Sequence, residues 1–547
     1  MTHLPETQYA VQITGVDAIE INPAKPVHRP GPHQILLEVE ASGICFSDTK
    51  LLHAFATHPR KGAVVGGVAP AVLAGLPSYV PGDLPTVPGH EPVARVVEVG
   101  DGVTHYRVGE RVLIQADWKH VPTASSNGAF GYNFEGALQQ YVLVDERLVV
   151  TPDDEFMLRV GEDASAAAIA LVEPWATVEG SYAWPERRSA TPGGRLLVVA
   201  DPGRDAAAAA EVASVAGEVV VIGGTLPGAD TAAGLDAVVG RRFDDVVYLG
   251  SDAATVEALG PLLAQRGILC VVLGGGRLGR DVAIDVGRIH YDFLRYVGTT
   301  GDDPAEGYAW IPATGEIRAG DRVLVVGAAG PMGVMHTLRA TTLGLAGVSV
   351  VAADVNDDRL ATLASLVAPK AAERGVDVRF VNSTREQPGD GFGYVVCLVP
   401  VPALAAAAVA ATSEGAIINV FAGFPAGTMA NLDLQGILER HVFLFGTSGS
   451  GNDDMRTVIR KVEAGVIDTT VSLDAVTGMA GFADAIRSVI DRTSGGKIMV
   501  YPALPDQGLV RLKDLPDALP HVAVLLRDGL WTKEAEDAFL GAATLGR

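Results

Sequence analysis

Residues 1 to about 150 contain short apolar runs, some alternating with polar residues and some continuous, separated by turn-forming residues. The runs with the clearest strand character are residues 34–40, 93–99, 111–114 and 140–144. Asp101-Gly102 and residues 108–110 supply turns between them. The pattern predicts a mostly β domain over this part of the chain.

The pattern changes near residue 320, where apolar runs begin to alternate with helix-like segments. The run 323–326 enters a glycine-rich turn at 327–333, a helix is predicted over 333–344, and a second apolar run ends on Asp354. Strands and helices that alternate in this way predict a doubly wound parallel sheet.

The glycine-rich turn is typical of a dinucleotide site. Glycines let the backbone approach a pyrophosphate, the helix N-terminus supplies N–H groups, and a carboxylate after the second strand accepts bonds from ribose hydroxyls. Gly333 and Asp354 are 21 positions apart, where about 20 are expected. The turn reads GxxGxxG (Gly327, Gly330, Gly333) and so departs from GxGxxG. A tight strand-to-helix turn that binds no nucleotide also uses glycine.

Residues 195–303 are a degenerate copy of residues 322–454. Four pairs of segments correspond in the same order: 195–200 with 322–327, 243–249 with 392–398, 266–272 with 414–420, and 293–301 with 443–449. The copy has about 20 residues fewer, and we expect them to be missing from its first helix–strand region. The chain therefore contains two Rossmann-like modules in tandem.

The first copy lacks the residues that the nucleotide needs. Asp201 and Asp205 stand in its turn, where an acid repels a pyrophosphate, and its second strand ends on Gly224 instead of a carboxylate. We expect a structural role for this module in packing, in oligomer contact or in shaping a cleft. A second nucleotide site is the alternative.

Bulk properties narrow the class of protein. A chain of 547 residues predicts two to four domains. The net charge of −23 argues against nucleic acid and anionic membranes as partners, although it also serves solubility. Three scattered cysteines form no disulfide framework, and no signal peptide or long apolar stretch is visible. We therefore expect a cytoplasmic protein.

Two short motifs in the N-terminal part carry metal-ligand chemistry. They are Gly43-Ile-Cys-Phe-Ser-Asp48 and Pro88-Gly-His-Glu-Pro92. Cysteine, histidine and glutamate are ligands that zinc accepts, and a catalytic zinc needs about three of them and an open position. Taken singly, Cys45 is explained as a buried small side chain, His90 as a loop histidine, and Glu173 as a charge at a helix end.

These motifs, with Glu173-Pro174 and the later glycine turn, resemble the zinc-dependent medium-chain dehydrogenase/reductases, especially the sorbitol-dehydrogenase-like enzymes. The resemblance covers nearly the whole chain. It implies one catalytic zinc held by Cys45, His90 and Glu91, with Glu173 as a fourth ligand or one that exchanges with water. It also implies that Ser47 relays the substrate proton and that Asp48 orients the ligating histidine. The residues implied in catalysis are Ser47, Asp48 and Glu91. The four-cysteine structural zinc lobe of many relatives is absent from residues 115–136.

The same resemblance implies a nicotinamide cofactor. We expect NAD(H) because Asp354 repels a 2′-phosphate and no arginine directly follows it, although Arg359 keeps NADP open. The nicotinamide half should lie near Gly423 and Thr447, at the carboxyl ends of later strands. The predicted cofactor-binding residues are Gly327, Gly330, Pro331, Met332, Gly333, Asp354, Gly423 and Thr447.

The interval between Cys45 and His90 is longer than is usual in that family. It carries a basic cluster of Lys50, His53, His58, Arg60 and Lys61. Such a cluster suits a phosphate on the substrate, or it is a solvated face of an insertion. Features of residues 446–502 resemble the branch that contains L-sorbose-1-phosphate reductase.

The predicted architecture is α/β: a GroES-like, mostly β catalytic domain into which two Rossmann-like modules are inserted. The expected parts are residues 1–190 (catalytic), 191–303 (degenerate module), 304–447 (NAD-binding module), 448–504 (return to the catalytic domain) and 505–547 (helical extension). The expected function is hydride transfer between NAD(H) and a secondary alcohol or ketone of a polyol, cyclitol or sugar. The expected partners are this small molecule and further copies of the chain, as a dimer or tetramer, with no nucleic acid or membrane. Two alternatives remain: a zinc dehydrogenase of a simple or amino alcohol, and a non-catalytic NAD-binding assembly protein.

Overall fold

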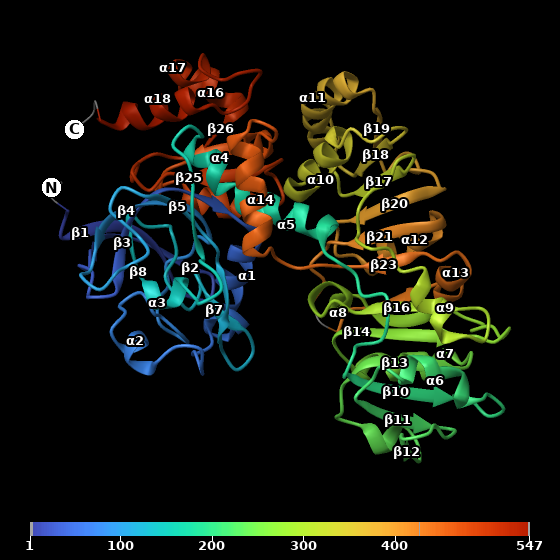
Figure 1. Ribbon diagram of the computed structural model, residues 1–547. Coiled ribbons are helices and arrows are strands. Elements are labelled where there is room, and N and C mark those ends of the chain that lie inside the picture. Colours follow the sequence, from blue (N-terminus) through green and yellow to red (C-terminus); the bar gives the residue numbers. More distant parts are fainter. Residues whose placement is uncertain (1–3, 426, 545–547) are drawn as a thin grey trace. The chain divides into compact units, whose positions relative to one another are not determined.

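The computed structural model describes residues 4–425 and 427–544 and divides the chain into two compact units. Unit 1 comprises Met1–Thr177 and Ser450–Arg547, and unit 2 comprises Val178–Gly449. Unit 1 is mostly β, and unit 2 contains two parallel sheets with Rossmann-like strand order (Figure 1). The predicted fold class is therefore confirmed.

Unit 1 is built on a sheet with the strand order β26-β24-β25-β3-β4-β5-β9, and β8 also pairs with β3. Each of the four apolar runs predicted as strands lies in one of these strands. The strands of unit 1 are β1 (Thr7–Gly15), β2 (Ala18–Pro26), β3 (Gln34–Ile44), β4 (Glu91–Val99), β5 (Arg111–Ile114), β6 (Asp117–Pro122), β7 (Asn127–Ala129), β8 (Tyr141–Asp145), β9 (Met157–Arg159), β24 (Leu473–Thr477), β25 (Lys497–Val500) and β26 (Val510–Arg511).

Short helices connect these strands. They are α1 (Phe46–Ala54), η1 (Phe55–Thr57), η2 (Pro59–Lys61), α2 (Pro70–Ala74), α3 (Glu146–Val149), α4 (Ala166–Ala170), α14 (Asn452–Glu463), η6 (Thr469–Ser472), α15 (Phe482–Ile490), η7 (Leu512–Asp514), α16 (Leu515–Ala518), α17 (Pro520–Ala523) and α18 (Lys533–Thr544). Helix α5 (Val172–Ala183) runs from unit 1 into unit 2. Buried aliphatic and aromatic side chains of β3, β4, β5 and β8 form the main core of unit 1.

Unit 2 contains two six-stranded parallel sheets, with the orders β12-β11-β10-β13-β14-β16 and β19-β18-β17-β20-β21-β23. The first module has β10 (Arg195–Ala200), β11 (Glu218–Ile222), β12 (Asp230–Ala232), β13 (Phe243–Leu249), β14 (Leu263–Val272), β15 (Val282–Asp285), β16 (Arg295–Thr299), η3 (Ala206–Ala209), α6 (Ala210–Ala213), η4 (Leu235–Val238), α7 (Ala253–Leu259), η5 (Gly260–Leu262), α8 (Val286–Tyr291) and α9 (Pro304–Ala309).

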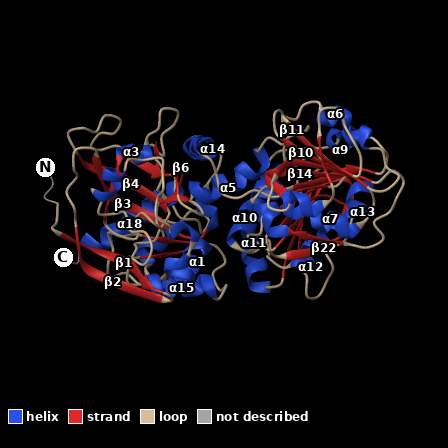
Figure 2. Ribbon diagram, turned by 90° about the horizontal axis from the view of Figure 1, so that it is seen from below, coloured by secondary structure: helices blue, strands red, loops and turns tan. Residues whose placement is uncertain are grey.

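The second module has β17 (Arg322–Val326), β18 (Ser349–Asp354), β19 (Asp377–Asn382), β20 (Phe392–Cys397), β21 (Thr412–Val420), β22 (Met429–Leu432), β23 (Phe443–Phe445), α10 (Pro331–Thr342), α11 (Asp357–Arg374), α12 (Pro402–Ala410) and α13 (Leu434–Glu439). Helices flank the strands of this unit (Figure 2). All four pairs of segments matched by sequence are equivalent strands of the two sheets.

The shorter length of the first module has a different origin from the one expected. Its first helical region is weak, since η3 and α6 replace the 12-residue α10. Most of the missing residues, however, lie after the second strand, where the loop 223–229 replaces the 18-residue helix α11. A parallel crossover without its helix leaves β11 and β12 less covered on that side of the sheet.

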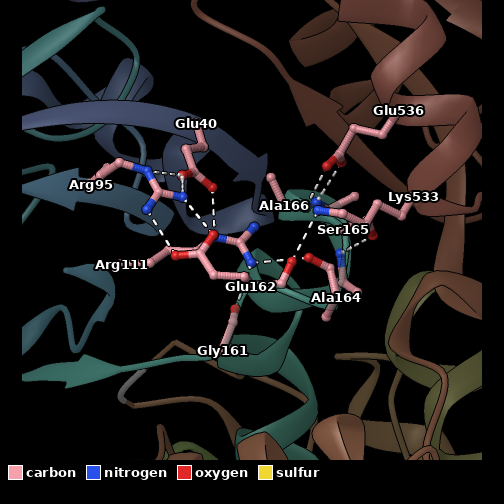
Figure 3. A network of polar contacts seen from close by, with 12 residues as sticks. Glu40, Arg95, Arg111, Gly161, Glu162, Ala164, Ser165, Ala166, Lys533 and Glu536 are labelled. Carbon is pink, nitrogen blue, oxygen red and sulfur yellow. Dashed lines mark hydrogen bonds and ion pairs between the residues drawn. The ribbon is translucent and has the colours of Figure 1, made fainter. Parts of the chain in front are cut away.

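The C-terminal extension is fastened to unit 1 by a buried carboxylate on α18 (Figure 3). Glu536 accepts hydrogen bonds from the backbone N–H groups of Ala166 and Ala167 and from the Tyr501 hydroxyl, at 2.5, 2.9 and 2.8 Å. Lys533 donates to the carbonyl of Glu162 at 3.0 Å. The extension thus caps the first turn of α4, which precedes the segment that carries Glu173.

Replacing Glu536 by alanine should destabilise unit 1 by about 1–3 kcal/mol, because two buried N–H donors lose their acceptor. Urea denaturation measures the change. Glu534→Ala on the exposed side of the same helix is the matched control and should have almost no effect. Equal stability of both variants would show that the extension does not hold α4.

Within residues 4–425 and 427–544, each helix is too short or too polar to cross a bilayer.

Candidate functional site

Three potential metal ligands converge at one end of the central sheet of unit 1. Cys45 precedes α1 directly after β3, and His90 and Glu91 stand at the start of β4. The pairing of β3 with β4 places Gly43 opposite Glu91, so the two motifs meet although 45 positions separate Cys45 from His90. Ligand atoms of Cys45, His90 and Glu91 lie within 4.8 Å of one another.

Asp48 fixes the orientation of both neighbours. Its Oδ1 lies 3.1 Å from Nδ1 of His90, and its Oδ2 accepts the N–H of Cys45 at 2.9 Å. With Nδ1 bonded to the carboxylate, Nε2 is the nitrogen directed toward Cys45. Burial alone would raise the pKa of Asp48, but His90 outweighs it and lowers that pKa. The buried carboxylate is therefore ionised and acts as a positioning group.

The Ser47 hydroxyl lies between two of the potential ligands. Its Oγ donates to Sγ of Cys45 at 3.0 Å and lies 3.2 Å from Nε2 of His90. The side chain is only partly buried. From this position the Ser47 hydroxyl can exchange a proton with a small molecule that binds next to Cys45 and His90.

Lys497 of β25 is a member of this site that sequence reasoning missed. Its Nζ pairs with Oε1 of Glu91 at 2.5 Å, and the side chains are 5% and 0% exposed. Burial would lower the pKa of Lys497, but Glu91, Cys45 and Glu173 outweigh it and raise that pKa. The only sequence signal was a lone lysine in the apolar strand 497–500.

The second carboxylate oxygen of Glu91 supports a metal at this position. Oε2 is buried and has no hydrogen-bond partner among the described residues. Gly43 makes room for it, since a Cβ there would lie 2.1 Å from Oε2. A sulfur, an imidazole nitrogen and a carboxylate oxygen that converge in this way fit a zinc ion.

Glu173 lies outside the group whose ligand atoms are within 4.8 Å of one another, but Glu91 and His90 of that group both shift its pKa. Burial raises the pKa of Glu173 to about 7, with a further contribution from Glu91. Its side chain is held in the first turn of α5. Near pH 7 the Glu173 carboxyl group can therefore gain or lose a proton in response to the charge of the candidate metal ligands.

The basic cluster expected between Cys45 and His90 does not form a single anion site. His53 contacts Asp17 near the surface, and Lys61 is buried and donates to the carbonyl oxygens of Val80 and Leu84. Arg60 pairs with Asp117 at 2.9 Å. Most of these cations are therefore neutralised or satisfied within unit 1.

Tyr132 instead links the insertion to the candidate metal ligands. Its ring centroid lies 5.6 Å from that of His90 and 5.2 Å from that of His58, and the Arg60 guanidinium lies 5.1 Å from its centroid. The hydroxyl is buried without a hydrogen-bond partner among the described residues. Burial, with the Arg60 and Lys50 cations, lowers the pKa of His58 to about 4, so this histidine is neutral near pH 7.

The glycine-rich turn of unit 2 has the backbone of a nucleotide site. Gly327 has a left-handed φ of 87°, and Gly330 precedes α10, whose first turn begins at Pro331 and contains Met332 and has no side-chain cap. A Cβ on Gly333 would lie 2.3 Å from the Gly327 carbonyl oxygen, so the helix can approach the strand only with glycine here. The N–H groups of Ala328, Ala329 and Gly330 bond within the protein, whereas those of Met332 and Gly333 in the first turn of α10 can face an anion.

Asp354 ends β18 as predicted and contacts this turn. Its Oδ2 accepts the N–H of Ala329 at 3.1 Å, and its Oδ1 pairs with Arg359 at 2.8 Å. Arg359 therefore lies directly beside the predicted ribose-binding carboxylate. Gly423 and Thr447 follow β21 and β23 at the carboxyl ends of the sheet, and the buried Thr447 hydroxyl has no partner among the described residues.

The corresponding turn of the first module is closed by its own side chains. Asp201 accepts the Tyr248 hydroxyl at 2.8 Å, and Arg204 donates to the carbonyl of Leu273 at 3.2 Å and pairs with Asp302 at 3.0 Å. The nucleotide-site geometry of the second module therefore has no counterpart here.

Comparisons with known proteins agree with the geometry of unit 1. Residues 31–154 match the alcohol dehydrogenase GroES-like domain family. The uncharacterized protein YggP of Escherichia coli is 24% identical over 244 residues, which are 41% of this chain and 57% of that protein. A sorbitol dehydrogenase of Halalkalibacterium halodurans is 27% identical over 235 residues, 41% of this chain and 56% of the enzyme. The chain thus spans little more than half the length of these relatives.

Solved structures extend the similarity to most of the chain. The 2R,3R-butanediol dehydrogenase of Bacillus subtilis aligns with a TM-score of 0.51 at 15% identity, over 91% of this chain and 100% of that enzyme. At this identity the match concerns the fold alone. Residues 31–154 are thus similar to the GroES-like domain of alcohol and sorbitol dehydrogenases, and the chain shares the fold of such enzymes over most of its length.

Proposed function

We propose that this protein is a zinc- and NAD(H)-dependent oxidoreductase that interconverts a secondary alcohol and a ketone of a polyol. The observation that carries the proposal is the convergence of Cys45, His90 and Glu91 beside the Ser47 hydroxyl. The intact glycine turn and Asp354 support the nucleotide part of it.

In this proposal Cys45, His90 and Glu91 hold the zinc and Glu173 faces it. When bound, the zinc supplies Lewis acidity toward the substrate oxygen and the nicotinamide accepts or donates the hydride. Asp48 keeps Nε2 of His90 directed inward, and Lys497 holds one oxygen of Glu91. Ser47 takes the hydroxyl proton during oxidation and returns it during reduction.

A neutral polyol fits the surroundings of Ser47 better than a sugar phosphate does. Arg60 and Lys61 are already paired or satisfied, and His58 is neutral near pH 7, which leaves little positive charge for a phosphate. Two of the similar proteins are named sorbitol dehydrogenase and (R,R)-butanediol dehydrogenase, after substrates without a phosphate, which supports the same choice.

Turnover of sorbitol, sorbitol 6-phosphate and threonine with NAD tests this substrate class. We expect the highest kcat/KM with sorbitol or a related neutral polyol. A clear preference for sorbitol 6-phosphate would show that the basic residues of the insertion bind phosphate. A preference for threonine would identify an amino alcohol dehydrogenase.

Replacing Asp354 by alanine should reverse the cofactor preference. The variant loses the acceptor for the ribose hydroxyls and frees Arg359 to face a 2′-phosphate. We expect NADH to bind about tenfold more weakly or worse, and NADPH to bind as well or better. Fluorescence titration measures both. Arg359→Ala is the control, which should weaken NADPH only, and equal losses for both cofactors in Asp354→Ala would contradict the assigned role.

Zinc uptake by the metal-free protein should strengthen as the pH rises from 6 to 8. Burial and Glu91 raise the pKa of Glu173 to about 7, so its carboxylate goes from about one tenth to about nine tenths ionised over this interval. A cation binds the ionised form, and uptake therefore releases protons. Calorimetry in buffers of different ionisation enthalpy counts them. Glu173→Gln should weaken the pH dependence without removing it, because Cys45 and His90 must also lose their protons when zinc binds. An unchanged pH dependence in that variant would show that Glu173 does not take part in zinc binding.

A further inference from the structure

The similarity between the two modules of unit 2 includes the segments that precede them, as well as their strands. Tyr182-Ala-Trp184 precedes the first module and Tyr308-Ala-Trp310 precedes the second. Shortly afterwards, Arg187 donates to the carbonyl of Asp244 at 3.1 Å, and Arg318 donates to the carbonyl of Gly393 at 3.3 Å. These two carbonyls stand at equivalent places, because each belongs to the second residue of an equivalent strand, β13 or β20.

The segments that precede the modules are exchanged between them. The Tyr182 hydroxyl bonds to Nδ1 of His336 at 2.7 Å, and its ring lies 5.7 Å from that of Tyr394, both in the second module. The Tyr308 hydroxyl donates to Asp245 of the first module at 3.2 Å. Each tyrosine therefore precedes one module in the chain and packs on the other. Helix α9, which carries Tyr308, was counted with the first module because it packs on β14 and β16 of that module.

Equivalent elements also pair with each other. Strand β15 of the first module is antiparallel to β22 of the second. The last residue of β15, Asp285, and the residue after β22, Asp433, each cap the next helix. When the two modules are aligned on these aspartates, Val282 takes the position of Ala430, and Ile284 takes the position of Leu432. The pairs in the ladder are Val282 with Leu432 and Ile284 with Ala430, so each pair is converted into the other when the modules are exchanged. This is the condition for an isologous, twofold interface.

The same relation holds around the ladder. Helix α8 contacts β21, its counterpart α13 contacts β16, and the edge strands β16 and β23 contact each other. His290 donates through Nδ1 to the carbonyl oxygen of Val420 at 3.1 Å, and a Cβ on Gly446 would lie 2.9 Å from Cα of His290. Arg295 lies 5.7 Å from the ring centroid of Phe445. Buried side chains of both modules form one continuous hydrophobic cluster.

We propose that residues 184–310 act as a built-in partner of the nucleotide-binding module, covering the surface that a second copy of that module would otherwise cover. The first module lacks the nucleotide chemistry, since its turn is closed by Asp201 and Arg204. It nevertheless has the twofold-related ladder and helix contacts to the second module. The sheet edge at β23 and the strand β22 are thereby covered within one chain. The homo-oligomer expected from the sequence does not form through this surface.

Cysteines at the axis of the interface test the proposal directly. Ala283 is equivalent to Asn431 and is paired with it, so two copies of the second module would instead place Asn431 opposite Asn431. Under mild oxidation, Ala283→Cys/Asn431→Cys should form a disulfide within one chain of 56.7 kDa, and Asn431→Cys alone should remain a single chain. Wild-type protein controls for the three native cysteines. An interchain dimer of Asn431→Cys, or no disulfide in the double variant, would overturn the proposal.

Hydrogen exchange provides a second test that does not depend on cofactor binding. In Gly446→Ala the new Cβ meets the Val420 carbonyl oxygen of β21 and the backbone of α8, so exchange in residues 282–291 and 429–432 should accelerate together at least about tenfold. Gly234→Ala, where a Cβ meets nothing within 4 Å, is the control in the same unit. Acceleration in only one of the two segments would show that the modules do not stabilise each other.

Discussion

Replacing Cys45 by alanine is expected to abolish turnover, by at least about 10³-fold, while NADH binding is retained. The sulfur is one of three ligand atoms that lie within 4.8 Å of one another, and it also accepts the Ser47 hydroxyl at 3.0 Å. Loss of a zinc ligand removes a contribution of several kcal/mol to the stabilisation of charge in the transition state, and each 1.36 kcal/mol is tenfold in rate. Steady-state kinetics and fluorescence titration with NADH measure the two effects.

Cys270→Ala is the matched control for this variant. Cys270 is also a cysteine, but it is buried in the first module, to which no metal ligand and no nucleotide-binding residue is assigned. It should keep its turnover and its zinc. If Cys45→Ala retained full activity, the zinc assignment would be refuted, and a parallel loss of NADH binding would point to misfolding instead.

Lys497→Met is expected to cost about 3–5 kcal/mol of stability in the metal-free protein. The change leaves the fully buried carboxylate of Glu91 without its counter-charge, and breaking one partner of a buried pair is costly for this reason. Burial would otherwise lower the pKa of Lys497, but Glu91, with Cys45 and Glu173, raises it. Urea denaturation in the presence of a chelator measures the loss.

The double variant Lys497→Met/Glu91→Leu separates charge from packing. Removing both charges should recover much of the stability, because no buried ion then lacks a partner. Lys497→Arg should be milder than Lys497→Met. If the double variant is as unstable as Lys497→Met alone, the loss comes from packing and not from an unpaired Glu91.

The parts of this site that the sequence predicts are those set by short stretches of chain. Cys45, Ser47 and Asp48 share one turn, His90 and Glu91 are adjacent, and the glycine turn and Asp354 lie within one strand–helix–strand unit. Lys497 is 406 positions from Glu91, and no local pattern links them. Tyr132 likewise meets His90 only through the folding of the loop before β8.

Two expectations changed for physical reasons. Charges close in sequence predicted a basic cluster, but Lys61 turns inward to two carbonyl oxygens and His53 turns outward to Asp17. The short copy predicted a reduced first helix–strand region, but the crossover helix after the second strand accounts for most of the difference. The repeat itself was visible because buried parallel strands keep their apolar runs even after the site residues are lost.

Zinc content measured together with NADH-linked turnover tests the central claim most directly. Purified protein should contain about one zinc per chain, should reduce a neutral ketose with NADH, should lose this activity on chelation, and should regain it with Zn²⁺. Zinc-free protein with undiminished turnover would contradict the metal assignment. Protein that holds no zinc and turns over no ketose would instead support a non-catalytic NAD-binding role.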